Sequence, residues 1–112
     1  MEKLYIAGKE QVFPHPLRMG TYNSKYHVVL LKASSKEIFN ENVFMFDAQG
    51  NFLWQINKAI IDKYKTSKIE PFVYAEFEQD GSDYQLRLWN WGGWKVSLDP
   101  KTGEELSYEF TK

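Results

Sequence analysis

Cysteine is absent from the 112-residue chain, which excludes a disulfide framework, a thiol nucleophile and a thiolate metal site. Histidine is scarce, with only His15, which lies between two prolines, and His27, which begins an apolar segment. A zinc site would therefore need further ligands. The chain also lacks a Gly-x-Ser-x-Gly elbow and a phosphate-binding glycine loop. These absences predict a non-enzymatic protein without a metal or a cofactor.

Long apolar runs and an excess of one charge are missing as well. The longest apolar run is short (Val28 to Leu31) and is far less than a membrane span needs. Fourteen basic and fifteen acidic residues give a net charge of -1, which disfavours a nucleic-acid interface and a polybasic membrane anchor. The segment Met1 to Tyr5 has no apolar core of a signal peptide. We therefore expect a cytoplasmic protein that binds neither nucleic acid nor a membrane.

What the chain has in abundance is aromatic residues, with eight Phe, seven Tyr and four Trp. Large rings bury much area per residue, so even a short chain can fill a core with them. No low-complexity tract or linker-like stretch interrupts the sequence. We predict one β-rich domain over residues 1–112.

Segments of aromatic and β-branched residues recur between Gly, Pro, Asn and Asp, which is typical of strands joined by turns. The predicted strands are residues 3–7, 26–32, 42–47, 51–57, 72–79, 84–90, 94–98 and 104–111. One short helix is predicted over residues 58–65, with Asn57 as its N-cap. The expected fold is all-β with minor α, an antiparallel meander of seven or eight strands. It would form a bent sheet or a small barrel-like sandwich, with the helix or a crossover near residues 58–68.

Two turns predict which side chains share a face. Pairing Asp47 with Asn51 across a turn with Gly50 places four rings on one face, and both faces of this hairpin are apolar, so we expect it to be covered on two sides. The four rings are Phe44, Phe46, Phe52 and Trp54. In the last hairpin, a five-residue loop over residues 99–103 would pair Val96 with Leu106 and Trp94 with Tyr108. That pairing puts Leu98, Leu106 and Phe110 on the same face as Trp94.

The hairpin at Asp80 to Asp83 places Glu76 opposite Arg87. For the next turn, a three-residue loop from Trp91 to Gly93 keeps Leu88 opposite Val96, whereas a two-residue Gly-Gly loop would mix polar and apolar side chains on each face. We favour the three-residue loop, which puts Trp89 on the outer, polar face of the sheet.

The aromatic group around this turn is the strongest functional feature, because Trp, Tyr and Arg often anchor interfaces. The predicted binding residues are Tyr74, Arg87, Trp89, Trp91 and Lys95. For Trp89 and Trp91 an exposed position and a place in the core remain alternatives, while Trp94 is expected in the core. Glu76 and Glu78 share the outer face, where Arg87 and Gln85 explain them as a solvated ladder better than as a catalytic pair.

Two stretches, Asn42 to Ile56 and Gly93 to Leu106, each contain a strand, an Asp, a Gly three or four residues further on, and another strand. Each resembles the blade repeat of quinoprotein-type β-propellers, although a propeller needs several blades, so the quinone site is not carried over. Together the stretches resemble small uncharacterised bacterial single-domain proteins of immunity or accessory type. The resemblance covers about half of the chain and implies a role in binding another protein.

We therefore expect a non-enzymatic protein-binding module of immunity or accessory type. The alternative is a small-ligand or carbohydrate-binding domain that uses the Trp cluster as a stacking platform, which requires a concave site. A third hypothesis is self-association through an edge strand or through the aromatic patch.

Overall fold

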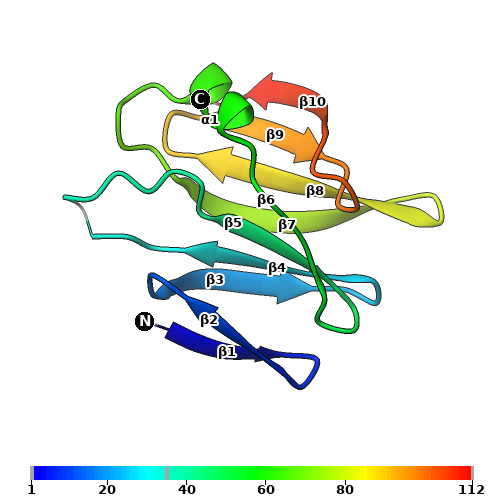
Figure 1. The fold of residues 1–112 in the computed structure, drawn as a ribbon. Coiled ribbons are helices and arrows are strands. Elements are labelled where there is room, and N and C mark those ends of the chain that lie inside the picture. The colour runs from blue at the N-terminus through cyan, green and yellow to red at the C-terminus, as the bar shows by residue number, and fades with distance from the viewer. Residues whose placement is uncertain (1, 35, 112) are drawn as a thin grey trace.

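A computed structural model describes residues 2–34 and 36–111, and within them the chain forms ten strands and one short helix (Figure 1). The strands are β1 (Glu2–Ile6), β2 (Lys9–Phe13), β3 (Leu17–Tyr22), β4 (Tyr26–Leu31), β5 (Val43–Asp47), β6 (Phe52–Gln55), β7 (Phe72–Asp80), β8 (Asp83–Asn90), β9 (Trp94–Leu98) and β10 (Glu105–Phe110). Helix α1 covers Lys58–Tyr64. The predicted fold class, an antiparallel β domain with one short helix, is confirmed.

The strands form two meanders in which consecutive strands pair. One sheet has the order β3-β4-β5-β6, the second has the order β10-β9-β8-β7, and the β1-β2 hairpin is a separate ribbon. The two four-stranded sheets face each other, and β7 lies beside β3 and β4 where they approach. Of the expected architectures, the chain therefore adopts a sandwich.

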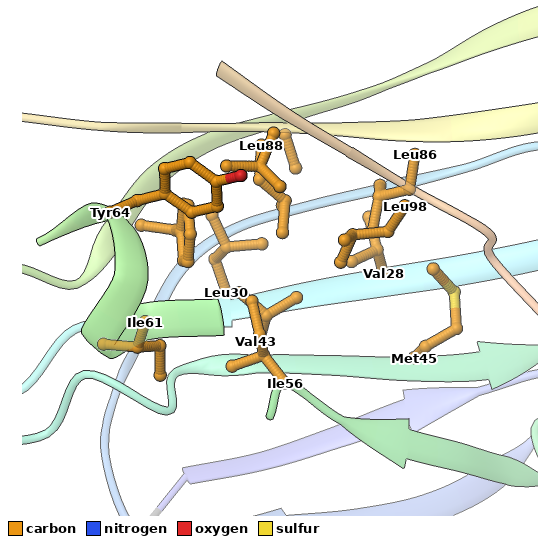
Figure 2. Close-up of a cluster of buried hydrophobic side chains, with 13 residues drawn as sticks. Val28, Leu30, Val43, Met45, Ile56, Ile61, Tyr64, Leu86, Leu88 and Leu98 are labelled. Carbon is orange, nitrogen blue, oxygen red and sulfur yellow. The ribbon is translucent and has the colours of Figure 1, made fainter. Parts of the chain in front are cut away.

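The main core lies between the two sheets and is closed at one end by α1 (Figure 2). Alternate residues of β4 and β5 meet alternate residues of β8 and β9, because side chains of a strand alternate between its faces. Ile61 and Tyr64 enter this core from α1. The helix begins as predicted, with Asn57 Oδ1 accepting a hydrogen bond from the Ala59 N–H at 2.8 Å. Sheet residues of this core include Val28, Leu30, Val43, Met45, Leu86, Leu88, Val96 and Leu98.

The β1-β2 hairpin forms a third layer on the outer side of the first sheet. Ile6 and Phe13 are buried there against Val29, Leu31 and Phe46. The Phe13 and Phe46 rings pack edge to face, with centroids 6.1 Å apart. This layer explains why β5 is apolar on both of its faces. The expected cover on two sides holds for β5 but not for β6, where Phe52 is exposed.

Buried asparagines connect loops to strands where the sheets supply no partner. Asn42 Nδ2 donates to the carbonyls of Leu31 and Phe72 at 2.9 and 2.8 Å, and Asn42 Oδ1 accepts from the Phe72 N–H at 3.1 Å. Asn40 binds the Lys68 carbonyl and the Glu70 N–H in the same manner. These two side chains attach the segment before β7 to the segment before β5.

Two strands were not predicted. β2 has the sequence Lys-Glu-Gln-Val-Phe, which lacks the density of apolar residues expected of a strand. Of its five residues, Phe13 is the buried one. β3 follows Pro14 and Pro16 and carries a bulge between Leu17 and Met19. Such an irregularity breaks the alternation on which strand prediction depends.

The predicted position of Trp54 was wrong. A bulge in β6 places Trp54 opposite Met45, so that its ring packs against the main core instead of sharing a face with Phe52. Trp54 Nε1–H donates to the Pro100 carbonyl at 2.8 Å. The ring also lies over Gly103, where an added Cβ would come within 2.8 Å of it.

The predicted register of the last hairpin was also wrong. Val96 lies opposite Tyr108 and Trp94 opposite Phe110, and a bulge between Glu105 and Ser107 leaves Leu106 52% exposed. Because the shift is two residues, Tyr108 and Phe110 keep the face that Trp94 occupies. The predicted pairings of Glu76 with Arg87 and of Leu88 with Val96 are confirmed, and Trp89 lies opposite Lys95.

Within the part of the chain that the structure describes, no helix has the length and apolar character that a membrane crossing requires.

Candidate functional site

Four of the five predicted binding residues lie together on the outer face of the second sheet. Tyr74 is opposite Trp89, and Trp89 is opposite Lys95, so these three side chains form a row across β7, β8 and β9. The rings of Tyr74 and Trp89 lie 5.4 Å apart and are inclined at 59°. Arg87 is two residues before Trp89 on the same face of β8. Tyr74 is exposed, and the other three are half-buried.

The charges of this face are already matched within the chain. Arg87 Nη2 is paired with Glu78 Oε2, and Lys95 Nζ lies 2.8 Å from Glu109 Oε2. The ammonium group of Lys95 lowers the pKa of the Glu109 carboxyl group below its ordinary value. Glu78 is therefore part of an ion pair on an open sheet face. The face is thus aromatic along one row, and both of its cations, Arg87 and Lys95, are in ion pairs.

Trp91, the fifth predicted residue, lies in the turn between β8 and β9. Asn90 fixes this turn from within the core: its Oδ1 accepts from the Trp94 N–H at 3.0 Å, and its Nδ2 donates to the Tyr64 carbonyl at 3.1 Å. Gly92 packs so closely that an added Cβ would lie 2.7 Å from Thr66 Cγ2. The turn is thus held on two sides, and the Trp91 side chain is directed outward with 64% of its surface exposed.

The loop beneath Gly92 is fixed by a buried carboxylate. Glu70 is 4% exposed, and its Oε2 accepts from the Thr66 N–H at 2.7 Å. The Thr66 hydroxyl donates to the other oxygen, Glu70 Oε1. Glu70 therefore has partners for both oxygens and stabilises the 66–70 loop on which Trp91 depends.

A concavity of about 340 Å³ lies beside Trp91, and we call it the Trp91 groove. It is lined by the start of β3, the segment that follows β4, the loop that precedes β7 and the turn between β8 and β9. Its apolar lining comes from Phe39, Ile69, Pro71 and Trp91, and its basic side chains are Arg18 and Lys32. The groove thus combines an exposed indole with an apolar lining and two cations.

The cations of the Trp91 groove, Arg18 and Lys32, form no ion pair within the described residues. Arg18 Nε is buried and, in this same part of the chain, meets no hydrogen-bond acceptor. The carboxylate that also lines the groove, Glu37, lies 3.7 Å from His15 Nε2. With two cations and one carboxylate, the groove has an excess of one positive charge.

Sequence reasoning missed Arg18 and Lys32. Their neighbourhood depends on β3, which was not predicted, and on the loop at residues 69–71, which lies far from both in sequence. The bulge at Arg18 removes that residue from the regular alternation of β3. In the described ranges, no group of three or more His, Cys, Asp or Glu side chains gathers closely enough to hold a metal ion.

The comparisons with known proteins give a family. Residues 1–110 match a family described as a domain of unknown function, DUF7957. The chain belongs to the DUF7957 family. No curated protein and no solved structure matches it. The match extends over both sheets and the β1-β2 hairpin, so the family comprises all three layers of the fold.

Proposed function

We propose that this DUF7957 domain is a non-enzymatic protein-binding module whose contact site is the Trp91 groove. The observation that carries the proposal is the 64% exposed Trp91 side chain at the edge of an apolar concavity. Exposed Trp residues beside pockets are frequent hot spots of interfaces, because burial of the indole removes a large apolar area from water.

The rigidity of the turn supports the proposal. Asn90, Gly92 and the Glu70-bound loop hold the backbone around Trp91, so the point from which the indole projects is fixed. A side chain that is already in place loses little conformational entropy when it is buried by a partner. The exposure of Trp91 is therefore a built feature of the fold.

The electrostatics of the groove indicate the chemistry of the partner. Arg18 and Lys32 offer positive charge to a partner in the groove. A protein segment that places an Asp or Glu carboxylate next to an apolar side chain would pair with these cations and cover the apolar lining together. We propose such an acidic and apolar segment as the occupant.

A second contact area would then come from the outer face of the second sheet, with Tyr74, Arg87, Trp89 and Lys95. Their charges are neutralised by Glu78 and Glu109, so this face adds apolar area with little electrostatic preference. The groove would confer the preference for a carboxylate. The immunity or accessory role and the carbohydrate-binding alternative stay predictions.

Affinity capture with matched variants tests the proposal. Wild-type protein, Trp91→Ala, Arg18→Gln and the control Tyr22→Ala would be used to capture partners from a lysate of the native host, and the captured protein would then be purified for titration. Tyr22 is 74% exposed and lies outside the groove, so it controls for general surface changes. We expect Trp91→Ala to weaken the partner's Kd at least about tenfold, and Arg18→Gln to weaken it and reduce its salt dependence.

Tyr22→Ala should leave the Kd unchanged. A partner that binds Trp91→Ala as tightly as wild type would contradict the proposal. Binding of a glycan array that depends on Trp91, with no protein partner, would replace it by the carbohydrate alternative.

A further inference from the structure

Strand β10 is the outer strand of the second sheet and has no strand on its other side among the described residues. Figure 1 shows it at the end of the sheet, with α1 nearby. Its apolar side chains are unusually open, since Tyr108 is 58% and Phe110 53% exposed. Edge strands of this kind attract further strands unless charge, proline or a covering segment prevents it.

The direction of the free backbone groups follows from the pairing with β9. The Thr111 N–H donates to the Gly93 carbonyl at 2.7 Å, so the backbone groups of Thr111 point toward the β9 side. In an antiparallel pair this direction alternates along the strand, so Glu109 and Ser107 point the same way. The N–H and C=O groups of Tyr108 and Phe110 therefore point away from the sheet, toward open solvent.

We propose that two copies of this chain associate through β10, antiparallel and with the two-fold axis at Tyr108. In this register Tyr108 lies opposite its own copy, Phe110 lies opposite Leu106 of the second copy, and the free backbone groups of the two strands pair. The two four-stranded sheets would join into one sheet of eight strands. The interface is independent of the Trp91 groove, so either proposal can fail without the other.

Charge supports the second copy as the occupant. Glu105 Oε2 accepts from Lys63 Nζ at 2.9 Å, and Glu109 Oε2 lies 2.8 Å from Lys95 Nζ. Both carboxylates of β10 are thus neutralised by lysines of their own chain, and two copies can approach without strong repulsion. In the proposed register Glu109 faces Ser107 of the second copy, so like charges are not placed directly opposite each other.

The other sheet edges fit this role less well. β7 and β3 lie beside each other, so both of these edges are covered. β6 has four residues against six in β10. β10 therefore provides the longer accessible edge of the two sheets.

Sedimentation velocity over a wide concentration range tests the association. The 13.2 kDa chain should shift toward twice that mass as its concentration rises, and Phe110→Lys should weaken the dimer at least about tenfold because a lysine on the edge opposes strand addition. The matched control is Phe52→Lys, which alters a 56% exposed side chain on β6 and should leave the dimer unchanged. Circular dichroism would confirm that both variants are folded.

A single introduced cysteine tests the register. The chain has no cysteine, so Tyr108→Cys carries one thiol, and in the proposed dimer it faces its copy at a Cα separation of about 5.5 Å, within disulfide range. Oxidation should convert Tyr108→Cys to a covalent dimer and leave the control Tyr22→Cys monomeric. Sedimentation as a monomer at every concentration, or a dimer unaffected by folded Phe110→Lys, would overturn the proposal.

Discussion

Asn42 shows how one side chain can connect two segments that the sheets leave apart. It is fully buried, and its amide completes hydrogen bonds for Leu31 at the end of β4 and for both backbone groups of Phe72 at the start of β7. A buried backbone group without a partner is costly, so a polar residue is required in an otherwise apolar environment. Asn90 serves the turn of Trp91 in the same way, and the exposure of that indole therefore depends on an asparagine in the core.

Replacement of Asn42 should be strongly destabilising. Asn42→Ala leaves two carbonyls and one N–H without partners, and each such group costs about 1–3 kcal/mol, so we expect the free energy of unfolding to fall by about 3 kcal/mol or more. Urea denaturation measures the change. The control is Gln55→Ala, which removes a 2.7 Å hydrogen bond to the Glu41 carbonyl at an exposed site and should cost less than about 1 kcal/mol. Equal losses in the two variants would show that Asn42 has no special role.

Among the elements, hairpins with regular alternation were predictable and bulged strands were not. From Tyr74 onward β7 alternates cleanly, as do β8 and β9, and their turns contain Gly81 and Gly93 at positive φ, so register and faces followed from local rules. The bulges in β6 and β10 displaced Trp54 and Leu106, because an inserted residue changes every later pairing of its strand. The row formed by Tyr74, Trp89 and Lys95 was predictable as well, because the lengths of the turns determine which side chains share a face.

The Trp91 groove was beyond sequence reasoning. Arg18, Ile69 and Trp91 come from three distant segments, and their proximity depends on how the two sheets pack. Local periodicity carries no information about such packing. The turn itself was predictable, whereas the surroundings of its indole were determined by tertiary contacts.

Contact between hairpins depends on the turn that joins β5 to β6. Gly50 has a φ of +83°, and an added Cβ would lie 2.2 Å from the Ile6 carbonyl oxygen of the β1-β2 hairpin. Gln11 Nε2 donates to the Gly50 carbonyl at 3.1 Å at the same junction. Two elements far apart in sequence thus meet where a side chain would not fit.

Gly50→Ala should therefore cost more than the positive φ alone. Gly81 supplies the control, because it has a φ of +64° and nothing lies within 4 Å of its added Cβ. We expect a loss of roughly 1 kcal/mol for Gly81→Ala and roughly 3 kcal/mol for Gly50→Ala. Chemical denaturation of both variants measures the difference. Similar losses at the two sites would mean that the β1-β2 hairpin does not press on this turn.

At the scale of the whole molecule, the question is whether the three layers unfold together. The first sheet is buried on both sides, by the second sheet and by the β1-β2 hairpin, and β4 and β5 contribute side chains to both cores. A strand that belongs to two cores transmits the loss of one to the other, since exposure of its apolar side chains on one face removes part of the free energy that keeps it ordered. The arrangement favours a single cooperative transition.

Phe13→Ala tests this cooperativity from the outermost layer. Phe13 is 4% exposed, and its ring packs against Phe44 and Phe46 at 5.3 and 6.1 Å, so its truncation should cost about 3–5 kcal/mol. Trp54 and Trp94 pack against the other core, which makes tryptophan fluorescence a remote readout of the same event. If the layers unfold together, the urea midpoint followed by fluorescence falls by the amount that corresponds to the whole loss of free energy. The control Val12→Ala, at a 51% exposed neighbour, should leave this midpoint nearly unchanged. A fluorescence midpoint that stays at the wild-type value in Phe13→Ala, with an earlier partial loss of the far-ultraviolet signal, would show that the β1-β2 hairpin separates first and that the two-sheet sandwich is stable without it.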